Sequence, residues 1–149
     1  MSTTPILNGQ VLGQAHYATR AVLERELARI RTSFQQSVAL NAVANNGGVV
    51  GRDWLLDRMT STLKIDESAA LETLTELTDA GLVEVLPDEQ PRVHLTKAGQ
   101  ALQHQISDAV ADITARLYAD IPAENMAVAG HVLTLVTQRA NAELAATKR

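Results

Sequence analysis

The stretch LTELTDAGLVEVLPDEQPRVHLTKAG, which spans Leu74–Gly99, decides the fold that we expect of this 149-residue chain. It begins with Leu residues at helical spacing, and Gly81 follows where helices commonly end in a left-handed residue. Two short apolar runs, LVEVL and RVHL, flank the turn PDEQP, in which Pro presets φ and Asp favours a turn. Thr96 can cap a following helix. The stretch therefore predicts a helix, a small β-hairpin and the start of a second helix.

Apolar periodicity predicts two helices near the N-terminus. The first covers about residues 11–30. Its apolar stripe consists of Leu23, Leu27, Ile30 and Phe34. Ser33 can cap the second helix, residues 34–44, and the Asn-Asn-Gly-Gly run at 45–48 is a stop signal.

Two shorter helices are predicted between that stop signal and Gly81. The first covers residues 52–63, and we expect its aromatic residue, Trp54, to anchor the core of this region. Asp66 offers a side-chain acceptor for the free N–H groups of the second. Two short helices followed by a hairpin form a compact unit of the helix-turn-helix type.

Two long helices are predicted after the hairpin. The inner face of the first consists of Leu102, Ile106, Ala109, Val110, Ile113 and Leu117. Asp120 can cap the last helix, with Pro122 in its first turn. The apolar stripe of the last helix consists of Met126, Ala129, Leu133, Val136 and Ala140. Apolar stripes at both ends of so small a chain favour a symmetric homodimer that covers them.

Composition excludes several classes of protein and site. The chain is 46% hydrophobic but has one Phe, one Trp and two Tyr, so its core is built from aliphatic residues. It contains no Cys, which excludes disulfides, thiolate catalysis and Cys-based zinc sites. The N-terminus does not resemble a signal peptide, and no apolar run approaches the roughly 18 residues that span a bilayer. We expect a cytoplasmic protein.

Residue patterns for catalysis or a cofactor are missing. The sequence has no Gly-rich phosphate loop and no nucleophile elbow, and none of its four His pair at the i, i+4 spacing of a helical metal site. We therefore expect no enzymatic activity, no cofactor and no metal.

The net charge of −4 is unevenly distributed. Residues 52–97 contain five basic and ten acidic side chains, which gives −5, whereas the other 103 residues carry eight basic and seven acidic, which gives +1. The segment most like a helix-turn-helix unit therefore holds the whole negative excess.

The segments LTDAGLVEVLP and VHLTKAGQAL resemble the MarR family of bacterial transcription regulators. Members typically have a Leu-rich helix, Gly-Leu-Val, a wing, and Leu-Thr-x-x-Gly at the start of a long dimerisation helix. The resemblance implies a mainly α fold with a small β-hairpin, that is, a winged helix-turn-helix with N- and C-terminal dimerisation helices. It divides the chain into an N-terminal dimerisation helix (1–32), a DNA-binding lobe (33–97) and C-terminal dimerisation helices (98–149).

The same resemblance implies partners. Such regulators are homodimers that bind double-stranded DNA, with the recognition helix in the major groove and the wing at the minor groove. Many are controlled by a small-molecule effector bound between the dimer helices and the lobe. The chain departs from the family in an acidic recognition helix, residues 66–80, and in the short wing loop PDEQP. The alternative is therefore a degenerate winged-helix module that binds proteins and has little or no DNA affinity.

Candidate site residues follow from DNA chemistry. Phosphates are bound by cations, hydroxyls and backbone N–H groups, and Glu can accept from cytosine N4. The candidate DNA contacts are Arg52, Arg58, Thr60, Ser61, Thr62, Lys64, Ser68, Glu72, Thr73, Glu76 and Arg92. The alternative for the hydroxyl residues is that they only form turns and caps. The alternative for the Arg, Lys and Glu residues is that they are solvated surface charges. Tyr17 and Arg20 are the candidate ligand-binding residues, with interface packing as the alternative for Tyr17.

Overall fold

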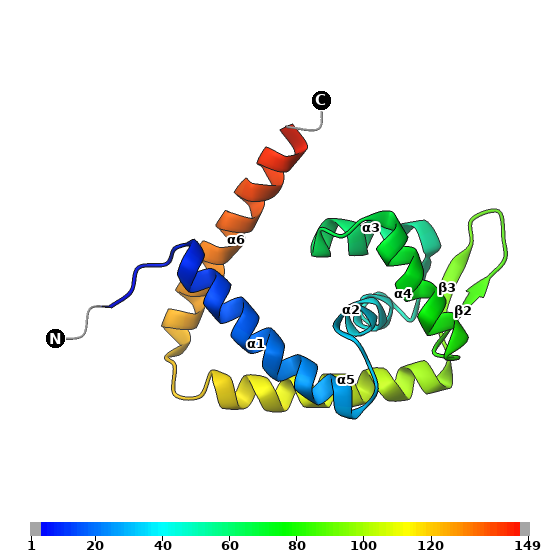
Figure 1. Ribbon diagram of the computed structural model, residues 1–149, viewed down its shortest axis with the longest axis horizontal. Helices are drawn as coiled ribbons and strands as arrows, with labels where there is room; N and C mark the ends of the chain where they lie inside the picture. Colours follow the sequence, from blue (N-terminus) through cyan, green and yellow to red (C-terminus); the bar gives the residue numbers. More distant parts are fainter. Residues whose placement is uncertain (1–3, 147–149) are drawn as a thin grey trace. The chain divides into compact units, whose positions relative to one another are not determined.

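The computed structural model describes residues 4–146, which form six helices and three strands (Figure 1). In chain order the elements are α1 (Gly9–Arg29), α2 (Phe34–Ala44), β1 (Val49–Gly51), α3 (Arg52–Leu63), α4 (Glu67–Asp79), β2 (Val83–Leu86), β3 (Arg92–Leu95), α5 (Lys97–Leu117) and α6 (Ala123–Ala146). The predicted fold class, mainly α with a small hairpin, is confirmed.

The sheet has one strand more than the sequence predicted. Strands β2 and β3 form the expected antiparallel hairpin, and β1 pairs with the other edge of β3, which gives the order β1-β3-β2. Strand β1 has only three residues, Val49–Gly51, and so lacks a readable alternation of apolar and polar side chains. Its buried residue, Val50, lies opposite Val93 in the register.

Helix caps explain where two of the predicted helices begin. The Ser33 hydroxyl accepts from the Gln36 N–H, and the Gln36 side chain accepts from the Ser33 N–H, which is a reciprocal capping box. The Asp66 carboxylate accepts from the Ala69 N–H at 2.8 Å. This hydrogen bond from the backbone lowers the pKa of Asp66, and a hydrogen bond from the Ser68 hydroxyl lowers it further.

The cap predicted for the last helix is wrong. Asp120 has a positive φ of 62° and lies three residues before Ala123, where α6 begins. Pro122 directly precedes the helix instead, and its carbonyl accepts from the N–H groups of Asn125 and Met126. Asp120 therefore belongs to the turn and not to the helix terminus.

The Leu-Thr-x-x-Gly motif joins α4, the hairpin and α5. Gly81 has a φ of 74°, so the chain turns out of α4 at a residue without a Cβ. The Thr96 hydroxyl donates to the Gly81 carbonyl and accepts from the Gly99 N–H. A Cβ on Gly99 would lie 2.0 Å from the Leu82 carbonyl oxygen, so only Gly permits this approach of α5. These contacts fix the hairpin against both helices.

The core lies among α2, α3, α4 and the sheet, and α1 and α5 cover it. Its fully buried large side chains are Leu27, Leu40, Val43, Leu55, Met59, Leu77, Val83, Val93 and Ile106. Trp54 was expected to anchor this core but is 39% exposed, because its neighbours Leu55 and Leu56 occupy the inner face of α3.

The chain divides into two compact units, Met1–Ile113 and Thr114–Arg149. The first contains the whole sheet and core. The second consists of the end of α5, a turn and the 24-residue helix α6, in which no residue is buried. No helix in residues 4–146 is both long and apolar enough to cross a membrane.

Candidate nucleic-acid interface and the adjoining cavity

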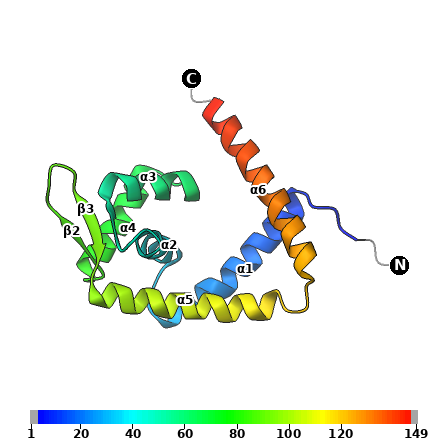
Figure 2. The same cartoon turned by 180° about the vertical axis from the view of Figure 1, so that it is seen from behind.

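Helices α3 and α4 pack on α2 and stand next to the sheet, whose β2–β3 loop projects away from the helices in both views (Figures 1 and 2). Lys64, the residue after α3, has a left-handed φ of 58°, and the chain reverses there into α4. Two helices joined by a tight turn and followed by a hairpin form a winged helix-turn-helix.

Arg52 and Arg92 lie together at the base of the wing. Arg92 pairs with Gly51, the residue before Arg52, in the β1–β3 register. The Arg52 N–H donates to the Pro91 carbonyl at 2.9 Å, which ties the first turn of α3 to the wing loop. No side chain caps that first turn, so the N–H groups after that of Arg52 lack a side-chain acceptor at the place where these two Arg residues lie. Asp53 lies 3.6 Å from the Arg52 guanidinium and offsets part of this charge.

The other two candidate cations lie further along α3. Arg58 is exposed, and its guanidinium carbon lies 5.7 Å from the centre of the Trp54 ring. The Lys64 ammonium donates to the Ser61 carbonyl at 2.6 Å at the end of the helix. A phosphate contact by Lys64 requires its ammonium to use another of its three N–H donors.

Three of the candidate hydroxyls donate within their own turns. Thr60 donates to the Asp57 carbonyl at 3.1 Å, Ser61 to the Arg58 carbonyl at 3.3 Å, and Ser68 to the Asp66 carboxylate at 3.1 Å. Each would have to exchange that bond in order to donate to a phosphate. Thr62 is exposed at the end of α3.

Thr73 faces the protein interior. It is 2% exposed, and its hydroxyl lies within hydrogen-bond distance of the Gln35 side-chain oxygen at 3.0 Å and the Ala69 carbonyl at 3.1 Å. A buried hydroxyl that joins α4 to α2 cannot reach a base or a phosphate, so we leave Thr73 out of the proposed DNA contacts.

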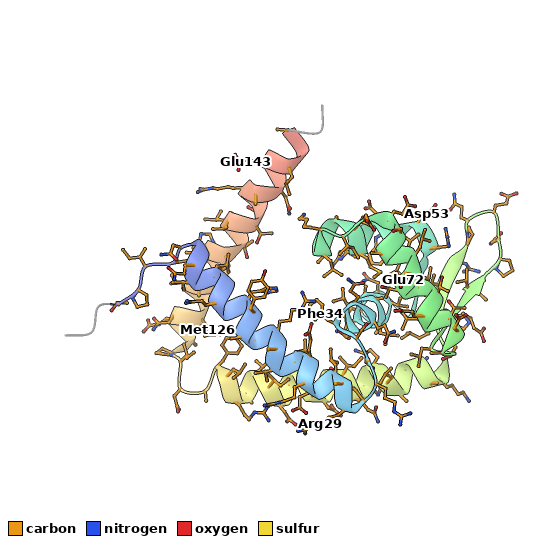
Figure 3. The ribbon with its side chains drawn as sticks, in the orientation of Figure 1. Arg29, Phe34, Asp53, Glu72, Met126 and Glu143 are labelled. Atoms are coloured by element: carbon orange, nitrogen blue, oxygen red, sulfur yellow. The ribbon has the colours of Figure 1, made fainter. Side chains whose placement is uncertain are left out.

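Glu72 and Glu76 line a cavity of about 420 Å³ between α1, α2 and α4. The lining residues are Arg20 and Glu24 of α1, Ser33, Phe34 and Gln35 at the start of α2, and Ala69, Glu72, Thr73 and Glu76 of α4. Figure 3 labels Phe34 and Glu72, which come from two of these walls. The two carboxylates thus border a cavity next to α1, an arrangement that the sequence did not predict.

Side chains bridge the three walls of this cavity. The Gln36 amide donates to the Glu76 carboxylate at 3.2 Å, next to the contact between Thr73 and Gln35. On the other side, the Arg20 guanidinium carbon lies 4.2 Å from the centre of the Phe34 ring. The start of α2 therefore connects the candidate recognition helix α4 to α1.

The two candidate ligand-binding residues lie in different surroundings. Arg20 lines the cavity and donates to the Glu24 carboxylate at 2.7 Å. Tyr17 is 71% exposed and makes an edge-on contact with His16, and it does not line the cavity. Of these two residues, only Arg20 therefore lies where it could contact a ligand in the cavity.

A second cavity of about 380 Å³ is lined by Asp53, Leu56, Asp57, Thr60 and Glu67, between α3 and the start of α4. Within residues 4–146, no group of three or more His, Asp or Glu side chains is arranged to hold a metal ion.

Sequence reasoning did not find Phe34, Gln35 and Gln36 as site residues. Their contacts with Arg20, Thr73 and Glu76 join residues up to 40 positions apart, and helical periodicity carries no signal for such pairs. The capping-box spacing of Ser33 and Gln36 was a readable signal for one of them.

Comparison with protein-family models gave no match, and comparison with curated sequences gave none either. Solved structures do match. CouR from Rhodococcus jostii RHA1, bound to p-coumaroyl-CoA, superposes with a TM-score of 0.76 at 16% identity, over 87% of this chain and 90% of that one. A mutant MarR from E. coli complexed with operator DNA superposes with a TM-score of 0.72 at 21% identity, over 86% of this chain and 91% of that one.

BpsR from Bordetella bronchiseptica superposes with a TM-score of 0.72 at 19% identity, over 87% of this chain and 97% of that one. Its structure is described with a mechanism for regulation of its DNA binding by 6-hydroxynicotinic acid. The chain therefore has the fold of the MarR-family regulators over nearly its whole length. The winged helix-turn-helix expected from the Leu-Thr-x-x-Gly resemblance is confirmed.

Proposed function

We propose that this chain is a dimeric winged-helix DNA-binding transcription regulator of MarR type. The observation that carries the proposal is the junction of α3 and the wing. There Arg52 and Arg92 lie at a helix start that no side chain caps, so two cationic residues and first-turn backbone N–H groups occupy the same place in the fold. This combination is the usual chemistry for contacts to the DNA backbone. The operator complex of the similarly folded MarR supports the same role for this fold.

The proposed contact set is smaller than that predicted from the sequence. It consists of Arg52, Arg58, Thr60, Ser61, Thr62, Lys64, Ser68 and Arg92. Glu72 and Glu76 are assigned to the cavity, because both carboxylates border it. With four cations per protomer, phosphate contacts supply modest affinity, and base contacts must supply the rest.

We propose a homodimer formed through the terminal helices. Helix α6 exposes Met126, Val128, Val136 and Leu144. Within its own unit, only the end of α5 and a turn accompany it, so the unit has too little structure to cover a 24-residue helix. A two-fold dimer would present two recognition helices to half-sites about one helical turn apart. The division into 1–32, 33–97 and 98–149 remains part of this proposal.

We also propose control by a small-molecule effector, since CouR and BpsR, which share the fold, are described with small organic molecules. The cavity between α1 and α4 is the effector site in this proposal. As part of this proposal, the protein acts in the cytoplasm and has no catalytic activity.

Selection of genomic fragments by the purified protein tests this function. We expect one or a few fragments to be enriched and to resist competition by excess unrelated DNA. No fragment retained even at low salt would contradict the regulator proposal and favour the alternative, an acidic module that binds basic protein surfaces.

A further inference from the structure

Carboxylates dominate the charge of the cavity between α1, α2 and α4. Its lining has three of them, on Glu24, Glu72 and Glu76, and one guanidinium, on Arg20. Arg20 is already paired with Glu24 at 2.7 Å. The two carboxylates on α4 lie one helical turn apart, a spacing at which like charges repel. The excess charge of the cavity therefore lies on the α4 wall.

That α4 wall has little internal compensation. Glu76 accepts one neutral amide hydrogen bond, from Gln36 at 3.2 Å. Glu72 has no hydrogen-bond or ion-pair partner within residues 4–146. An anionic ligand placed here would face unpaired carboxylates, whereas a cation would pair with them.

The aromatic wall favours the same charge. The guanidinium of Arg20 lies 4.2 Å from the centre of the Phe34 ring, well inside the range of a cation–π contact. The cavity thus already holds one planar cation against its aromatic ring and a carboxylate. This contact is independent of the α4 carboxylates, and a ligand cation on the same face of the ring would take the place of Arg20.

Ligand size and coupling follow from the three walls. A volume of about 420 Å³ lies within the range of small-molecule sites and suits a compound with one ring. A cation bound by Glu76 would pair with the same carboxylate that accepts from the Gln36 amide. Occupancy therefore alters a contact that holds the recognition helix α4 on α2.

We propose that this cavity binds a small organic cation, a one-ring amidinium or ammonium compound, through Phe34, Glu72 and Glu76, and that it excludes anions. The binding claim stands by itself. The regulatory claim, that the cation changes DNA affinity, rests on the proposed function.

Three isosteric probes test the charge preference: benzamidinium, neutral benzamide and anionic benzoate. Calorimetry with the full chain should give benzamidinium the highest affinity, about tenfold above benzoate, as a cation–π contact combined with an ion pair implies. Equal or tighter binding of benzoate, or no binding of benzamidinium, would overturn the proposal.

Charge-neutralising variants locate the site. Glu72→Gln and Glu76→Gln should each weaken benzamidinium binding about threefold, and the double variant more, because each removes one partly exposed ion pair. The matched control is Glu67→Gln, which removes the same charge from α4 outside this cavity. Unchanged affinity in the double variant, or an equal loss in the control, would contradict the assignment. Thermal melting checks that all four variants are folded.

The regulatory arm uses the fragment selected by the protein. Benzamidinium should shift the DNA affinity of the unmodified chain and leave that of the Glu72→Gln, Glu76→Gln double variant unchanged. If the chain binds no DNA, the proposed function fails while calorimetry still decides the cation site. If benzamidinium and DNA both bind and neither changes the affinity for the other, the regulatory claim is wrong.

Discussion

The Thr96 hydroxyl donates a hydrogen bond to the Gly81 carbonyl over 2.6 Å, across 15 residues of sequence. The same hydroxyl accepts from the Gly99 N–H at 3.0 Å. One side chain therefore caps α5 and holds the end of α4 against it.

Removal of this hydroxyl should destabilise the whole lobe. We expect Thr96→Ala to lower the free energy of unfolding by about 2 kcal/mol, because it removes a helix cap and a hydrogen bond between elements. Thr96→Ser should restore most of the loss. Urea denaturation measures both. A Thr96→Ala variant as stable as the parent would show that the clamp contributes nothing.

Gly99 allows a second test of the same junction. A Cβ there would lie 2.0 Å from the Leu82 carbonyl oxygen. Relief of this clash requires a shift of the backbone, which costs more free energy than a shift of a flexible side chain. We expect Gly99→Ala to cost about 3 kcal/mol, at the upper end of overpacking effects. Gly13→Ala is the control, since a Cβ on Gly13 meets no atom within 4 Å. It should stabilise α1 by about 1 kcal/mol through helix propensity. Similar melting temperatures for the two variants would refute the close approach.

Thr73 separates a structural role from a DNA-binding one. Thr73→Val keeps the shape but loses the hydroxyl that contacts Gln35 and Ala69. We expect a loss of about 1 kcal/mol in the free energy of unfolding. DNA affinity, measured at a temperature where the variant is fully folded, should not change. A lower affinity of the folded variant would return Thr73 to the DNA contacts.

Asp66 makes stability depend on acid pH. Its folded pKa is lowered, chiefly by the Ala69 N–H, so the stability it contributes is present above the unfolded pKa near 3.8. That contribution is lost as pH falls through the folded pKa. We expect Asp66→Asn, which keeps a side-chain acceptor, to flatten the decline in stability between pH 4 and lower values. Thermal melting at several pH values measures this. A parallel decline in the stability of parent and variant would contradict this role.

Short-range signals predicted much of the fold. Ser33, Asp66 and Thr96 were recognised as caps and Gly81 as a helix stop because each acts on backbone within a few residues. Asp120 failed as a cap because the turn before α6 takes two more residues than its spacing suggested. A local sequence pattern predicts whether a segment is a helix or a strand better than it predicts the residue at which that element begins.

Contacts between distant residues account for what the sequence did not predict. Strand β1 forms only because β3 offers it a free edge. The burial of Thr73 depends on Gln35, which lies 38 positions away. The cavity exists only where α1, α2 and α4 meet, so Glu72 and Glu76 could be assigned to a helix but not to its neighbours.

The salt dependence of binding to the selected DNA fragment, with Arg92→Ala beside the parent chain, tests the central claim most directly. Eight candidate cations in a dimer limit the slope of log affinity against log salt to about −7. Arg92→Ala should weaken binding about tenfold and flatten the slope by about 2, since a dimer loses two phosphate contacts. Arg25→Ala, an equal loss of charge on α1, should change neither. Specific binding with these slopes is the predicted result, and no binding at low salt, or equal effects of both variants, would contradict the account.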